Sequence, residues 1–237
     1  MKRWTPGGAL KKSSGRAANQ LLADLSHSDY RRVSPHLQSI TLAFAAVLTE
    51  RNALVGHVYF PTSGLIALHT ATIGRPSLAM VGSEGMVGSS VAAGVAKSEA
   101  LVVVQGEGAA MRLHARRFRL LVERSPTLQR QIHRHTVDLL RRASQTAVCN
   151  DVHRTEARLA RCLLETSDRA GTRYLRVTQE QLAHLIGARR SSVSIVATSM
   201  RHRRLISYAR GHLRITDRKG LRRLACACYR AEWLSRR

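Results

Sequence analysis

The chain of 237 residues has few acidic residues, few aromatic residues and no long apolar run. It contains 15 Asp+Glu against 39 Lys+Arg, a formal net charge of +24, and its aromatic content is 4%. The longest uncharged stretch, between Arg51 and Arg75, contains Asn52, Pro61 and several glycines, so it does not predict a transmembrane helix. No apolar core follows the N-terminal residues Met1-Lys2-Arg3-Trp4, so we expect a cytoplasmic protein with no membrane association.

The large positive charge favours a polyanionic partner, with nucleic acid first and an anionic membrane surface second. A hydrophobic content of 44% is ordinary for a globular protein, so wholesale disorder is excluded. Residues 1–17 are polar and basic, and we expect them to form a flexible basic tail. No phosphate-binding loop, dinucleotide-binding motif or catalytic constellation is present, so we do not expect an enzyme.

Cysteine is scarce and confined to the second half of the chain. Without an export signal, we expect Cys149, Cys162, Cys226 and Cys228 to be reduced thiols. Cys226 and Cys228 are separated by one residue, too few for the usual zinc pair, and no second pair has matching spacing. The sequence therefore predicts no metal and no cofactor, and a redox role for Cys149 or Cys162 stays open.

Short apolar runs dominate the chain from about residue 40 to 113. Glycine and proline separate them, which favours a β-sandwich or β-roll over helices. The Gly-rich residues 82–88 are expected to form a loop. The runs cover residues 54–60, 65–68, 78–81, 101–104 and 109–113.

A long helix is predicted from Pro126, a residue suited to the first helical position, to about Cys149. No glycine or proline interrupts this segment. One set of positions has the 4-3 spacing of a two-helix seam, which suggests a dimer helix. The alternative is a surface helix that packs on its own domain. The seam positions are Leu128, Ile132, His135, Leu139, Arg142 and Thr146.

Residues 178–200 predict a helix-turn-helix. Thr178 and Gln181 form a capping box at the start of the first helix, and Gly187 ends that helix. The second helix carries an apolar stripe at i, i+3, i+4 and i+7, beginning at Val193. Its opposite face is polar, so it can lie in a DNA major groove. That outward face contains Arg190, Ser191, Ser194 and Thr198.

Two strand-like segments follow, at residues 205–208 and 212–215, with Ala209-Arg210-Gly211 as a tight turn between them. A hairpin directly after a recognition helix is a wing, and its tip can reach phosphates. Asp217 is expected to cap a final helix.

These features together resemble the Crp/Fnr superfamily of bacterial transcription regulators. The motifs that carry the resemblance are residues 178–187, Arg190, Val193, Leu205-Ile206 and Gly211, with residues 58–64, 84–88 and 156–160 upstream. The resemblance covers nearly everything after about residue 18. It implies a cyclic-nucleotide-binding-like β-roll, a long dimerisation helix and a C-terminal winged helix-turn-helix.

The chain departs from the family's known sensor types. Members that bind cyclic AMP carry Gly-Glu and then Arg-Ser or Arg-Thr, but here Met86 follows Gly85 and Lys97 precedes Ser98. We therefore expect an effector other than cyclic AMP. The cysteines of the iron-sulphur branch are absent from the N-terminal half. Haem ligation by His57 or His69 is an alternative, and we favour ordinary roles in the sheet for both. In the second helix, Ser191 and Ile195 replace a Glu and an Arg of the best-known members.

The fold class predicted is α+β: an N-terminal β-roll (double-stranded β-helix or jelly-roll-like), a long dimerisation helix and a C-terminal winged helix-turn-helix. The domains expected are residues 1–17, a tail; 18–149, a sensor domain whose dimer helix covers about 125–149; and 150–237, a DNA-binding domain. The function expected is that of a dimeric transcription regulator that reads a two-fold symmetric operator. A ligand sensor without a specific DNA role is the alternative.

The partners expected are double-stranded DNA, a second copy of the chain and, if the protein is an activator, RNA polymerase; the effector is unknown. The expected base-reading residues are Arg190, Ser191, Ser194 and Arg189. The expected phosphate contacts are Thr178, Gln179, Arg201, Arg203, Arg210 and His212. The candidate effector residues are Gly85, Met86, Val87, Gly88 and Lys97.

Overall fold

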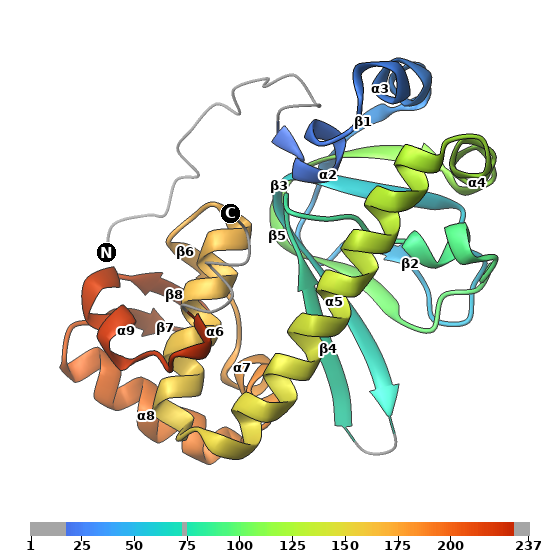
Figure 1. Cartoon of the computed structure of the whole chain (residues 1–237). Helices are drawn as coiled ribbons and strands as arrows, with labels where there is room; N and C mark the ends of the chain where they lie inside the picture. The colour runs from blue at the N-terminus through green and yellow to red at the C-terminus, as the bar shows by residue number, and fades with distance from the viewer. Residues whose placement is uncertain (1–17, 73–74, 230–237) are drawn as a thin grey trace.

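The computed structural model describes residues 18–72 and 75–229, which form an N-terminal sheet unit and a C-terminal unit joined by one long helix (Figure 1). The expected basic tail, residues 1–17, lies outside the described residues, as do residues 230–237 of the expected DNA-binding domain. No helix in the described part of the chain is long and apolar enough to cross a membrane.

The N-terminal unit is built on an antiparallel sheet with the strand order β1-β5-β3-β4, in which β2 also pairs with β5. Short helices precede the sheet, and the predicted loop at residues 82–88 leads from it into a 3-10 helix. The strands are β1 (Gln38–Leu42), β2 (Val47–Thr49), β3 (His57–Thr72), β4 (Arg75–Val81) and β5 (Leu101–His114). The helices are α2 (Gln20–Ala23), α3 (His27–Val33), η1 (Ser34–His36) and η2 (Ser89–Ala93).

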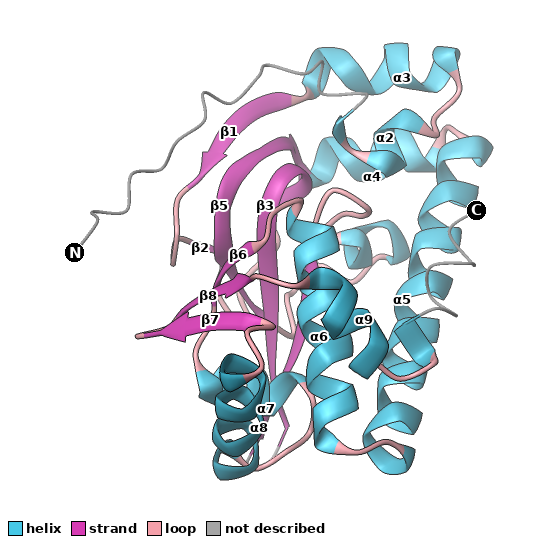
Figure 2. Ribbon diagram, turned by 90° about the vertical axis from the view of Figure 1, so that its left-hand side faces the viewer, coloured by secondary structure: helices cyan, strands magenta, loops and turns pink. Residues whose placement is uncertain are grey.

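The sequence predicted separate short strands where the structure has two long ones. Runs 54–60 and 65–68 fall mainly within β3, and runs 101–104 and 109–113 both fall in β5. The glycine between the first two runs marks a bend rather than a turn: Gly64 has φ +80, and a Cβ there would lie 2.5 Å from the carbonyl oxygen of Gly106. The strand register also shifts around Gly64. Glycine thus lets the paired strands approach closely while they curve, as Figure 2 shows for β3 and β5.

Helix α4 (Ala115–Glu123) leads to the long helix α5 (Pro126–Val152), which confirms the prediction of a long helix. Ser125 caps α5 by accepting a hydrogen bond from the backbone N–H of Leu128. Leu128 and Ile132 are buried in the same core as the aromatic residues Phe60 and Phe118 of the sheet unit. The predicted seam was therefore wrong: Leu128 and Ile132 belong to the core of the sheet unit, Arg142 pairs with Glu84, and Thr146 accepts a hydrogen bond from Arg161. A helical period shows that one face is buried, but not against what.

The C-terminal unit begins with α6 (Thr155–Ala170) and continues through a helix-turn-helix to a small antiparallel sheet of order β6-β8-β7. Its core includes Leu159, Leu163, Val193 and Met200, all buried. The unbroken α5 places the junction between the units at His153 and Arg154, slightly beyond the predicted residue 150. The elements are α7 (Gln179–Leu185), α8 (Arg190–His202), α9 (Arg218–Leu224), β6 (Tyr174–Arg176), β7 (Ile206–Ala209) and β8 (His212–Ile215).

A buried group of charges connects the two units. Glu84, in the loop after β4, lies 3.2 Å from Arg142 of α5 and 3.4 Å from Arg169 of α6. The side chain of Glu84 is only 4% exposed. Gln105 of β5 adds a second connection, because it donates to the backbone carbonyl of Arg176 and accepts from Gln181. The sheet unit therefore contacts the C-terminal unit through specific polar bonds.

Candidate nucleic-acid interface

The helix-turn-helix has the local structure that the sequence predicts. The backbone N–H of Gln181 donates to the Thr178 hydroxyl, and the Gln181 side chain accepts from the backbone N–H of Thr178, which completes the capping box. Gly187 follows α7 with φ +59, a conformation that glycine adopts without strain. A Cβ at Gly187 would lie 2.8 Å from Nδ2 of Asn150 in α5, so the turn also contacts the long helix.

The main neighbours of α8 in the described part of the chain are α6, α7 and β7, all of the C-terminal unit (Figure 1). Arg190 and Ser191 are exposed in the first turn, and Ser194 is half-buried on the next turn. Arg189 is the N-cap residue and is exposed, but its side chain makes no capping hydrogen bond. The four predicted base-reading residues thus lie together at the N-terminal end of the helix, the end that approaches bases in helix-turn-helix proteins.

Arg190 has one acidic neighbour across the motif. Its Nε lies 4.0 Å from Oε2 of Glu180 in α7, and the two side chains are 71% and 56% exposed. An exposed pair at this distance contributes little to stability. The guanidinium is therefore available to exchange this carboxylate for a base edge.

Ile195 is a residue of this face that the prediction of base contacts omitted. It is 72% exposed, in the middle of the outer face of α8. An exposed isoleucine at this place can make an apolar contact with the methyl group of thymine in a major groove. The sequence indicates the exposure of Ile195, because this residue lies outside the apolar stripe that begins at Val193.

The wing is present as predicted, and its tip projects a basic residue. Arg210 and Gly211 connect β7 to β8 with φ values of +49 and +80. Two adjacent positive φ values are typical of the two-residue turns that join twisted strands. A third strand, β6, pairs with β8 and was not predicted, because three residues carry too little period to identify a strand.

The remaining predicted phosphate contacts surround α8. Arg201 is exposed in its last turn, whereas Arg203 lies 2.8 Å from Glu156 of α6. Thr178 is exposed at the start of α7, Gln179 is half-buried beside it, and His212 is exposed at the start of β8. Most of the predicted phosphate contacts are thus exposed at the surface, whereas Arg203 is paired with an acidic residue.

The candidate effector residues do not form a common surface. Met86 and Val87 are buried, at 1% and 4% exposure, within the core of the sheet unit. Gly88 adopts φ +88 at the start of η2, and Lys97 is exposed in a bridge with Leu54. Met86 is held by His135 of α5, whose Nε2 lies 3.2 Å from the Met86 carbonyl oxygen. Burial lowers the pKa of His135 below its ordinary value, which keeps this ring neutral.

Comparison with known proteins agrees with this geometry. Residues 157–224 match a family model described as a Crp-like helix-turn-helix domain. No curated protein sequence matches the chain. A match to a DNA-binding domain agrees with the expectation of a regulator rather than an enzyme.

Solved structures share the fold across nearly their whole length. A transcriptional regulator of the Crp/Fnr family from Eubacterium rectale is 17% identical, with a TM-score of 0.65 over 88% of this chain and 98% of that chain. FixK2 from Bradyrhizobium japonicum is 13% identical, with a TM-score of 0.63 over 81% and 98%. The c-di-GMP responsive global regulator CLP from Xanthomonas campestris is 17% identical, with a TM-score of 0.61 over 80% and 99%.

Because these identities are low, the structural likeness shows the fold alone. The family match identifies the C-terminal domain. Together they confirm the resemblance that the sequence carries and the α+β fold class. The chain has the fold of the Crp/Fnr transcription regulators, and residues 157–224 form its Crp-like helix-turn-helix DNA-binding domain.

Proposed function

We propose that the chain is a homodimeric transcription regulator that reads a two-fold symmetric operator through α8. The observation that carries this proposal is the outer face of α8, where Arg190, Ser191 and Ile195 are exposed beside a basic wing. An arginine in this position can donate two hydrogen bonds to guanine O6 and N7, which discriminates by about 1–3 kcal/mol. Ser191 and Ser194 add weaker polar contacts, and Ile195 adds a thymine methyl contact.

Phosphate contacts complete the interface. Arg201 lies in the last turn of α8, and Arg210 lies in the turn at the tip of the wing. Arg203, Thr178, Gln179 and His212 add further donors. Such contacts fix the orientation of a domain on DNA without reading its sequence.

The outward face of α5 supports the dimer. Val137, Leu140, Val148 and Val152 are 63%, 68%, 55% and 67% exposed. Val137, Leu140, Val148 and Val152 lie at i, i+3, i+11 and i+15, so they share one face of the helix, which Ser144 interrupts at i+7. An apolar stripe of this kind is costly in water and has the spacing of a coiled-coil seam. Two copies joined along α5 would present two α8 helices to successive major grooves, about 34 Å apart.

The hydrogen bonds and ion pairs between the two units support a sensor role for the N-terminal unit. We propose that its effector is not cyclic AMP. Met86 is a buried core residue where cyclic-AMP binders carry a ribose-binding Glu. A buried phosphodiester without its ionic partners would be costly. RNA polymerase is the further partner if the protein is an activator.

Selection of bound sites from a random DNA pool, with and without cell metabolites, tests the proposed function. We expect enrichment of a two-fold symmetric site whose half-sites are one helical turn apart, bound by two chains. Equal retention of all sequences, or a monomer on the selected DNA in sedimentation, would contradict the proposal. Retention that responds to metabolites in the sensor unit but never selects a sequence would favour the alternative of a ligand sensor without a specific DNA role.

A further inference from the structure

Four potential metal ligands from distant parts of the chain meet where the two units join. Cys149 and His153 lie at the C-terminal end of α5, and Cys226 and Cys228 follow α9. Each side chain offers one ligand atom, and these four atoms all lie within 4.8 Å of one another. The sulfur atoms of Cys149 and Cys226 are 3.5 Å apart. All four cysteines in the structure are free thiols, and only Cys162 is outside this group.

We propose that Cys149, His153, Cys226 and Cys228 bind one zinc ion, which fastens the end of the DNA-binding domain to the end of α5. Three thiolates and one imidazole are a common ligand set of structural zinc sites, with Zn–S and Zn–N distances of about 2.3 and 2.0 Å. A tetrahedron of that size separates its sulfur atoms by about 3.8 Å. The distance between Cys149 and Cys226 is close to this value.

The surroundings of the four ligands fit a metal. Nδ1 of His153 is buried and has no hydrogen-bond partner among the described residues. Buried polar atoms are normally paired, and a zinc ion would provide the missing partner. The side-chain amide of Gln145 donates to the sulfur of Cys228 at 3.1 Å. A donor of this kind holds a metal-bound sulfur in place and stabilises its negative charge.

The nearby charges also fit. A zinc ion with three thiolates and a neutral imidazole carries a net charge of −1. Arg161, which is 4% exposed, is close enough to Cys149 and Cys226 for an electrostatic interaction with both. Its ion pair with Glu165, at 3.1 Å, continues through Arg169 to Glu84 in the sheet unit. The zinc site would thus lie at one end of the charged group that connects the two units.

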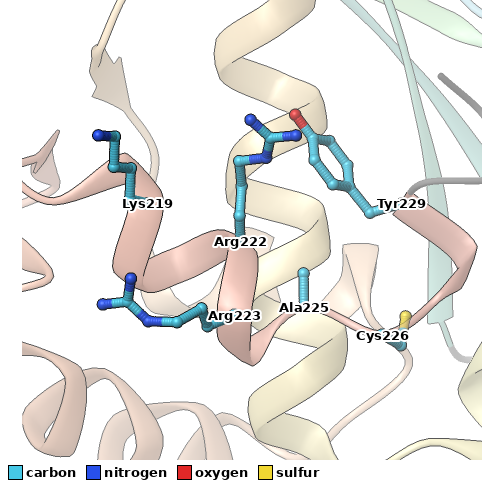
Figure 3. A pocket seen from close by; sticks show the side chains of 6 residues that line it. All are labelled: Lys219, Arg222, Arg223, Ala225, Cys226 and Tyr229. Atoms are coloured by element: carbon cyan, nitrogen blue, oxygen red, sulfur yellow. The ribbon is translucent and has the colours of Figure 1, made fainter.

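One of the four ligands, Cys226, lines a surface hollow. A hollow of about 360 Å³ is lined by Cys226 and by residues of α9 and the segment after it. Figure 3 shows Cys226 next to Ala225, among the labelled residues that line this hollow. One ligand of the proposed site therefore borders a hollow that is open to the surface.

The spacing of Cys226 and Cys228 alone argued against a metal, because one intervening residue rarely forms a zinc pair. The fold changes this argument, since Cys149 and His153 supply the other two ligands from a different element. The proposal does not depend on the proposed DNA target, because it concerns metal content and stability.

Zinc analysis of the full-length, untagged chain tests the proposal. After purification under reducing conditions from zinc-supplemented cells, we expect about one zinc per chain. Cys228→Ser and His153→Gln should each reduce the zinc content at least tenfold, whereas Cys162→Ser, a buried control outside the group, should keep it. A wild-type content below about 0.1 per chain, or equal contents in wild type and Cys228→Ser, would overturn the site.

Cobalt substitution and thermal unfolding provide a second readout if a variant folds poorly. The cobalt-loaded wild type should show thiolate-to-cobalt charge transfer and the strong visible bands of a tetrahedral site. A chelator should lower the melting temperature of the wild type and of Cys162→Ser, and it should not change that of Cys228→Ser. A cobalt spectrum without thiolate bands would assign the metal to surface histidines and refute the proposal. A disulfide between Cys149 and Cys226 in the reduced preparation would refute it as well.

Discussion

Gly187→Ala tests whether the turn of the helix-turn-helix is held against the long helix. Gly187 has φ +59, and an alanine in this conformation costs roughly 1–2 kcal/mol from its backbone alone. The added Cβ would also lie 2.8 Å from Nδ2 of Asn150, so that side chain must move. Crowding of this kind adds about 1 kcal/mol or more. We therefore expect Gly187→Ala to lower the free energy of unfolding by about 2–3 kcal/mol.

Gly171 provides the matched control. It ends α6 with φ +65, and nothing lies within 4 Å of a Cβ placed there. Gly171→Ala should therefore show only the backbone cost. Urea unfolding followed by circular dichroism measures both variants, and the midpoints compare them if the slopes are unchanged.

The double variant Gly187→Ala/Asn150→Ala isolates the contact with α5. Removing the Asn150 amide makes room for the new Cβ. Measured against Asn150→Ala alone, the double variant should therefore lose only as much unfolding free energy as Gly171→Ala loses against the wild type. Equal costs for the two glycine variants, or no recovery in the double variant, would refute a close contact between the turn and α5.

Three further predictions concern the dimer, the pH dependence of stability that Asp29 causes, and the Glu84 ion pairs that link the two units. Leu140→Asp should convert the dimer to a monomer in sedimentation, while Leu120→Asp, an exposed leucine of α4, should not; an unchanged dimer would exclude the α5 face. Burial alone would raise the pKa of Asp29, but hydrogen bonds from Ser125, Thr127 and Ser26 outweigh it and lower the pKa, so the contribution of Asp29 to stability is present at neutral pH and is lost as the pH falls through the lowered pKa. Asp29→Asn should therefore make the loss of unfolding free energy at acid pH less steep, and an equally steep loss would contradict this. Glu84→Gln removes the buried carboxylate that the partly buried Arg142 and Arg169 share, and it should cost roughly 3 kcal/mol in urea unfolding. Glu107→Gln should cost almost nothing, and equal midpoints for Glu84→Gln and wild type would show that the link is not stabilising.

The parts of the fold that the sequence predicted are those with local signals. The capping box at Thr178, the glycine at 187 and the apolar stripe from Val193 each act within a few residues, so the sequence alone locates the helix-turn-helix. The same holds for the wing, where Gly211 marks the turn, and for α9, whose cap Asp217 accepts from the backbone N–H of Gly220.

The parts that the sequence did not predict depend on distant contacts. Leu128 and Ile132 have the spacing of a seam, but only the tertiary structure shows that they belong to the core that contains Phe60 and Phe118. Similarly, Cys149 and Cys226 are separated by 77 positions, so their meeting could not be inferred from spacing.

The sequence did not predict the ion pairs between the two units, for the same reason. The sequence singled out Glu84 only as part of a Gly-rich loop, whereas the structure buries it between arginines of α5 and α6. Gly64 has the sequence signal of a turn, but it forms a bend because the facing strand brings Gly106 next to it.

The comparison of Arg190→Ala with Arg210→Ala on the selected operator tests the central claim most directly. Arg190→Ala should relax the preference at one base of each half-site, a loss of about 1–3 kcal/mol of discrimination. Arg210→Ala should weaken binding to all sequences about equally and reduce the salt slope by about one unit per chain. A uniform loss of affinity by Arg190→Ala for specific and random DNA, with the base preference unchanged, would contradict reading of the operator by α8.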